Sequence, residues 1–66
     1  MQNRLRVIRA ELGMSQETLA QLSGLSRATV NRIEKGRYTP TGTTMMKLSR
    51  ALRRPATSIF LSLASV

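Results

Sequence analysis

The stretch SQETLAQLSGLSRATVNRIEKG, residues 15–36, decides the fold that we expect for this chain of 66 residues. Two segments with helical apolar spacing meet at Gly24, and each begins with a serine whose hydroxyl can cap a helix. Glycine adopts positive φ readily, so Gly24 permits a tight turn. We therefore expect a helix over 15–23, a turn, and a second helix that begins at Ser26 and ends before Gly36.

A further helix is predicted upstream of this stretch. Leu5, Ile8 and Leu12 recur at helical spacing, and Gly13 follows where a left-handed C-terminal cap would lie. We expect this helix over 3–12, with the three apolar side chains facing the core.

Downstream, a fourth helix is expected between Thr41, which can act as its N-cap, and Pro55, which breaks the helical pattern. Residues 37–41 are expected to be extended, because Pro40 biases the residue before it away from helical dihedrals. The residues expected in the core from this helix are Met45, Leu48 and Leu52, with Met46 as a gap filler.

The stretch ATSIF, residues 56–60, reads as a short fifth helix that adds its last two residues to the core. The tail, residues 61–66, fits two patterns. Its apolar and polar residues alternate as in a strand, whereas Ile59, Leu63 and Val66 also fit one face of a helix. Both conformations remain open for the tail.

The amino-acid composition excludes several classes of function. Eleven Lys and Arg against three Glu give a net charge of +8, which favours a polyanionic partner. The chain has no Cys and no His, so we expect neither a disulfide nor a metal site, and no pattern indicates a cofactor or a small-molecule ligand. The glutamates fall in separate predicted helices and no glycine-rich phosphate loop is present, so we do not expect an enzyme.

The apolar runs are too short for a membrane span. The longest strongly apolar run is 59–61, whereas a spanning helix needs about 20 residues. The N-terminal stretch MQNRLRVIRAEL is cationic but lacks the apolar core and the cleavage site of a secretory signal. We therefore expect a cytoplasmic protein.

The helix expected from Ser26 has two distinct faces. With about 3.6 residues per turn, Val30 and Ile33 share one face. The opposite face holds Arg27, Ala28, Asn31, Arg32 and Lys35. Such a helix fits the major groove of DNA, which is about 12 Å wide. The alternative is a charged face that is merely solvated.

Residues near the start of this helix could read bases. Arg27 can donate two hydrogen bonds to O6 and N7 of a guanine, and Ala28 can contact a thymine methyl group. Arg32 lies one turn further along. Gln16, at the amino end of the preceding helix, has an amide long enough to reach a phosphate that the helix dipole also attracts.

Taken together, these residues resemble the helix-turn-helix core of the phage repressor and Cro family, also called the xenobiotic-response-element family. The matching residues are Ser15, Gln16, Leu19, Ala20, Gly24, Ser26, Thr29, Val30, Ile33, Glu34 and Gly36. The similarity continues through YTP and LSRALRRPATSIF, so it covers nearly the whole chain. It implies a five-helix, all-α domain with the helix-turn-helix in 15–36. From its length the chain is expected to be one domain over 1–66, in which 61–66 is a candidate dimerisation tail.

The resemblance also implies roles for individual residues. The base-reading positions that it implies are Arg27, Ala28 and Arg32. The phosphate contacts that it implies are Gln16, Lys35, Arg37 and Tyr38, to which Asn31 is added from its place on the polar face. The family commonly pairs an arginine of the first helix with the glutamate of the third, and Arg9 and Glu34 occupy those positions. Tyr38 could instead cover the edge of the core.

Three residues depart from the family pattern. Gly42 stands where the family usually has an aliphatic residue, and Arg53 and Arg54 replace the usual Gly and Val before the proline. The two arginines could complement the negative end of the fourth helix or add basic surface for DNA.

The resulting expectation is a homodimeric, sequence-specific regulator of transcription, a repressor, that binds a palindromic operator in double-stranded DNA with its third helix in the major groove. The tail is interpreted as a two-fold interface rather than as closure of the monomer core, because one short recognition helix offers few contacts. An antitoxin-like protein-binding module with secondary DNA binding is one alternative. A cationic membrane-surface peptide is another.

Overall fold

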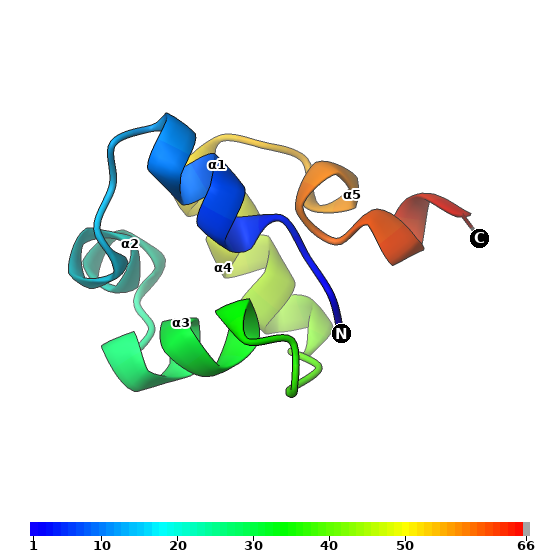
Figure 1. Cartoon of the computed structure of the whole chain (residues 1–66), viewed down its shortest axis with the longest axis horizontal. Coiled ribbons are helices and arrows are strands. Elements are labelled where there is room, and N and C mark those ends of the chain that lie inside the picture. Colours follow the sequence, from blue (N-terminus) through cyan, green and yellow to red (C-terminus); the bar gives the residue numbers. More distant parts are fainter. Residues whose placement is uncertain (66) are drawn as a thin grey trace.

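The computed structural model describes residues 1–65, which form five α-helices and a closing 3-10 helix (Figure 1). The elements are α1 (Leu5–Glu11), α2 (Gln16–Ser23), α3 (Arg27–Glu34), α4 (Gly42–Leu52), α5 (Ala56–Ile59) and η1 (Leu61–Ser65). The all-α class and the five-helix arrangement expected from the sequence are confirmed.

The helices surround one apolar core to which all five contribute. Its buried residues are Leu5, Ile8, Leu19, Ala20, Val30, Ile33, Leu48, Leu52, Ile59 and Phe60. Because these side chains pack against one another, the apolar faces are not free to lie on a lipid surface, which disfavours the membrane-surface alternative. No helix within residues 1–65 has the length and apolar content needed to cross a bilayer.

Each of the longer helices begins at a hydroxyl side chain. Ser15, Ser26 and Thr41 accept hydrogen bonds from the backbone N–H groups of the residues three positions later, at 3.0, 3.1 and 3.3 Å. These bonds satisfy donors that a helix leaves free in its first turn. The predicted caps of α2, α3 and α4 are therefore confirmed.

The turn between α2 and α3 depends on Gly24. Its φ is +72°, and the next residue, Leu25, donates its N–H to the carbonyl of Ala20 at 3.0 Å. This bond closes the end of α2 in the manner of a Schellman motif, which requires a left-handed residue. The chain can then start α3 in a new direction after only two more residues.

Arg53 adopts the same left-handed conformation at the end of α4, with φ +54°. Arg54 donates its N–H to Ser49 O at 3.2 Å and Arg53 donates to Arg50 O at 3.3 Å, so a full Schellman motif forms without glycine. In return, Ser49 Oγ donates to Arg54 O at 2.6 Å. The backbone keeps the geometry that the family's usual glycine would give, although a non-glycine residue is strained there.

Asn3 joins the beginning of α1 to the end of α3. Its Oδ1 accepts from the N–H of Leu5 at 3.0 Å, and its Nδ2 donates to the carbonyl of Ile33 at 2.9 Å. The segment before α1 is also held by a hydrogen bond from Arg4 N to Ile59 O at 2.8 Å. This part of the chain therefore ties α1, α3 and α5 together.

Two expectations for core residues are wrong. Leu12 is 42% exposed: its N–H still bonds to Ile8 O at 3.0 Å, but α1 ends at Glu11, and Leu12 lies outside the core beside the chain reversal at Gly13. Met46 is 49% exposed, because it lies about 100° around α4 from its neighbour Met45, which does pack against the core.

The tail adopts a conformation that neither sequence pattern described. It forms the 3-10 helix η1, on which Leu61 and Leu63 are 53% and 37% exposed. Leu63 N donates to Phe60 O at 3.0 Å, which fixes the start of this turn on the buried end of α5. Val66, which the helical pattern included, lies outside the described residues.

Candidate nucleic-acid interface

Helix α3 has one face in the core and one face in solvent. Val30 and Ile33 are fully buried, whereas Arg27, Ala28 and Arg32 are exposed. The division into two faces predicted from the spacing is therefore present in the structure. The exposed face can approach another molecule along its whole length.

The α2–α3 pair holds this face in place. Helix α2 packs against both α3 and α4, and it buries Leu19 and Ala20 in doing so. The small side chain of Ala20, only 4% exposed, leaves room for the neighbouring helices at the turn. Ser26 caps the first turn of α3, so Arg27 and Ala28 project from an ordered helix start.

Arg9 of α1 and Glu34 of α3 form an ion pair beside this surface. Arg9 Nε lies 2.8 Å from Glu34 Oε2, and Arg9 Nη2 donates to Glu34 Oε1 at 3.2 Å. Arg9 Nη1 donates to the carbonyl of Met14 at 2.8 Å. The hydrogen bond to Glu34 and the charge of its carboxylate raise the pKa of Arg9 against the opposing effect of burial. The pair fixes α1 against α3 and neutralises the carboxylate.

The amide of Gln16 joins the same cluster. Gln16 Nε2 donates to Glu34 Oε1 at 3.0 Å and to Asn31 Oδ1 at 3.3 Å. Both Gln16 and Asn31 are half-buried. A side chain expected to reach for a phosphate is thus already ordered, and it lies between the start of α2 and the exposed face of α3.

Two adjoining hollows border the exposed face of α3. One, of about 330 Å³, is lined by Arg6, Arg9, Gln16, Asn31, Glu34 and Lys35. The other, of about 240 Å³, is lined by Arg32, Lys35, Arg37 and Tyr38. Lys35 lines both, so the hollows form one continuous basic surface. Among the described residues that line it, Glu34 is the carboxylate, and Arg9 neutralises it.

The second hollow forms where α3 gives way to the following loop. Gly36 has a φ of +74° and turns the chain, so Arg37 is exposed and Tyr38 is half-buried against the core. The guanidinium of Arg32 lies over the ring of Tyr38, with Cζ 4.9 Å from the ring centroid. Tyr38 therefore covers the edge of the core and also lines the basic surface.

Arg6 is a basic residue of this surface that sequence reasoning missed. It is exposed and lines the first hollow together with Gln16 and Lys35. The signal was present, because residues three apart on a helix share a face and Arg6 lies three residues before Arg9. The structural role of Asn3, which joins α1 to α3, was missed as well. Its contact with Ile33 O depends on how the chain folds back.

The sequence of this chain is similar to those of known proteins. A helix-turn-helix family profile matches residues 5–59. An HTH-type transcriptional regulator of Methanothermobacter thermautotrophicus is 43% identical over 54 residues, which cover 82% of this chain and 78% of the relative.

Two solved structures have the same fold. The restriction-modification controller protein C.AhdI from Aeromonas hydrophila is 42% identical with a TM-score of 0.80, and the alignment covers 83% of each chain. The P22 c2 repressor, solved in complex with a synthetic operator, is 28% identical with a TM-score of 0.77, and the alignment covers 82% of each chain.

Proposed function

Because the chain belongs to the helix-turn-helix family of the phage repressor and Cro type, we propose that it represses transcription as a homodimer bound to a palindromic operator. Like that family, it is a DNA-binding regulator and not an enzyme. The observation that carries the proposal is the exposed, cationic face of α3, held by a capped helix-turn-helix and bordered by a continuous basic surface. A cytoplasmic location is part of the proposal, since double-stranded DNA is the partner.

We assign two different roles on DNA to residues of the exposed face of α3 and of the basic surface that borders it. Arg27, Ala28 and Arg32 are proposed to face base edges in the major groove. The residues proposed to contact phosphates are Gln16, Asn31, Lys35, Arg37 and Tyr38, with Arg6 added from its place in the first hollow. The formal charge of +8 supplies the attraction to any duplex, and the α3 side chains supply the choice among sequences.

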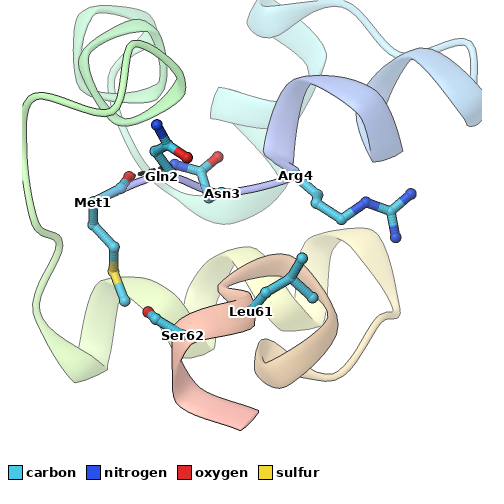
Figure 2. Close-up of a pocket in the computed structure, with 6 residues that line it drawn as sticks. All are labelled: Met1, Gln2, Asn3, Arg4, Leu61 and Ser62. Carbon is cyan, nitrogen blue, oxygen red and sulfur yellow. Dashed lines mark hydrogen bonds between the residues drawn. The ribbon is translucent and has the colours of Figure 1, made fainter. Parts of the chain in front are cut away.

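The tail is proposed to form the two-fold interface. Leu61 and Leu63 place apolar surface in solvent at the end of the chain. A hollow of about 520 Å³ lies between residues 1–4 and η1, and Figure 2 shows Leu61 and Ser62 on one side of it. A dimer paired through the tails would have to place its two α3 helices about 34 Å apart to reach successive major grooves.

Selection of bound duplexes from a random pool, at a stated salt concentration, tests the operator. We expect the enriched sequences to contain two inverted half-sites whose centres lie about 10 base pairs apart. Enrichment of one asymmetric half-site would contradict the palindrome. Recovery of unselected sequence would contradict specific DNA recognition itself.

Sedimentation equilibrium tests the dimer separately. We expect the wild-type protein to sediment as a dimer and the variant with Leu61→Ser and Leu63→Ser as a folded monomer. Leu22→Ser is the matched control, because Leu22 is 59% exposed but lies on α2. A dimer that persists in the tail variant would contradict the assigned interface.

A further inference from the structure

The contact between Arg32 and Tyr38 joins the exposed face of α3 to the core. Arg32 is an exposed side chain, with its guanidinium carbon 4.9 Å from the centroid of the Tyr38 ring. The ring itself is half-buried and packs against the core. The anchored partner is therefore the ring, and the guanidinium rests on it.

The loop after α3 holds the ring in this position. Gly36, in the left-handed region, reverses the chain directly after α3, and the buried Pro40 restricts the backbone on the other side. Tyr38 lies between these two fixed points. Its ring packs against the core, a contact that does not involve the arginine.

The residues around Arg32 include other cations, so the aromatic ring is the group that can attract its guanidinium. Lys35 and Arg37 line the same hollow as Arg32 and Tyr38, and among the described residues that line this hollow there is no carboxylate. No acidic side chain there can orient the guanidinium by an ion pair. The negative face of the aromatic ring is the group that attracts it.

A free arginine side chain has many rotamers, and fixing them on binding costs conformational entropy. Readout of guanine requires the planar guanidinium to present two donors in one direction. A guanidinium already stacked on a ring has fewer orientations to lose. It is also less free to turn toward the nearest phosphate, which carries no sequence information.

We propose that Tyr38 is a positioning residue for sequence readout, whose ring holds the guanidinium of Arg32 in the direction needed to read a guanine of duplex DNA. This inference rests on the proposed function, because it assumes that Arg32 faces base edges. It assigns to the ring of Tyr38 a role distinct from any phosphate contact of its hydroxyl group. The ring affects the choice of sequence, whereas the hydroxyl affects affinity for every duplex.

The experiment measures discrimination at one base pair. For each variant, the dissociation constant is measured on the selected duplex and on a duplex changed at the base pair where Arg32→Ala relaxes preference. The ratio of the second constant to the first measures discrimination. We expect Tyr38→Leu to lower this ratio about two- to fivefold, the range for a partly exposed cation–π contact. Tyr38→Phe and Tyr38→Trp keep a ring and should keep the ratio, even if the loss of the hydroxyl weakens binding to both duplexes equally.

The double variant separates positioning from general damage to the fold. A smaller folded fraction lowers affinity for both duplexes by the same factor, so the ratio does not change. In the Arg32→Ala background, Tyr38→Leu should leave the ratio unchanged, since no guanidinium remains to be positioned.

Three outcomes would overturn the inference. One is an unchanged ratio in Tyr38→Leu, and another is an equal loss in Tyr38→Phe. The third is the absence of any base pair at which Arg32→Ala relaxes preference, which removes the base-reading role of Arg32 but leaves that of Arg27 intact. A wild-type protein with no preference among duplexes would instead refute the proposed function.

Discussion

Arg9 and Glu34 meet in a two-pronged ion pair in which the glutamate side chain is only 5% exposed and the arginine 17%. The same carboxylate also accepts the amide of Gln16. One acidic side chain thus connects α1, α2 and α3. Its removal should affect the whole helix-turn-helix rather than a single contact.

We expect Glu34→Gln to lower the free energy of unfolding by about 1 to 3 kcal/mol, because it leaves the half-buried side chain of Arg9 without a counter-charge. Urea denaturation followed by circular dichroism measures this. Glu11→Gln is the control, since Glu11 is exposed and should change stability by less than about 0.5 kcal/mol. Equal losses in the two variants would show that the pair has no special importance for the fold.

The contribution of Arg9 should not depend on pH in the neutral to mildly alkaline range. Its pKa is raised by Glu34, and a group whose pKa is raised on folding contributes stability that is fully present below its unfolded pKa. The pKa of an arginine in an unfolded chain already lies far above this range. The difference in unfolding free energy between wild type and Arg9→Met should therefore stay constant across this range in urea titrations. A steady decline with rising pH would contradict it.

Asn3→Ala should destabilise the protein by about 1 to 2 kcal/mol, because both the cap on Leu5 N and the bond to Ile33 O are lost. Thermal unfolding measures the loss, and Gln2→Ala, at an exposed neighbour, should leave the midpoint nearly unchanged. If the two midpoints fall together, the bridge from Asn3 to α3 is not what stabilises this end of the molecule.

Arg53→Gly should stabilise the fold by about 0.5 to 1 kcal/mol. Glycine relieves the cost of a left-handed φ, and this gain exceeds the loss of a cation near the end of α4. Arg50→Gly is the matched control, because Arg50 lies within α4 and should cost about 1 kcal/mol. Chemical denaturation of both variants gives the comparison, and destabilisation by Arg53→Gly would refute the strain.

Arg27→Ala and Lys35→Ala should affect DNA binding in different ways. Arg27→Ala should cost about 1 to 3 kcal/mol on the selected operator and relax preference at one base pair. Lys35→Ala should weaken binding to all duplexes alike and reduce the salt dependence by about one phosphate contact. Fluorescence anisotropy on cognate and scrambled duplexes at several salt concentrations checks both. If both variants lose equally on the two duplexes, the division of roles is wrong.

Most of the helix-turn-helix could be predicted because its signals are local. Ser15 and Gly24 determine where α2 starts and ends, and Ser26 determines where α3 starts, through bonds that span only a few residues. The two faces of α3 follow from its spacing alone. The positions of Arg9 and Glu34 came from the family resemblance and not from any local rule.

The errors concern element ends, and the omissions concern contacts that depend on tertiary structure. Leu12 fits the helical spacing, but the helix ends before it. The tail has neither glycine nor proline, and its spacing fits more than one pattern, so the sequence did not choose among strand, α-helix and 3-10 helix. The bonds of Gln16 to Glu34 and Asn31, and the stacking of Arg32 on Tyr38, join residues brought together only by the fold. The roles of all these residues on DNA remain predictions.

The eight residues of α3 set a limit on what one subunit can distinguish. At about 1.5 Å per residue the helix is about 12 Å long, which matches roughly four base-pair steps of 3.4 Å. A given four-letter word recurs by chance about once in 250 positions, whereas a genome offers at least about 10⁶ competing positions. A single subunit would therefore be distributed over thousands of chance matches. Two subunits at a fixed spacing require two such words together, and this combination occurs by chance far less often.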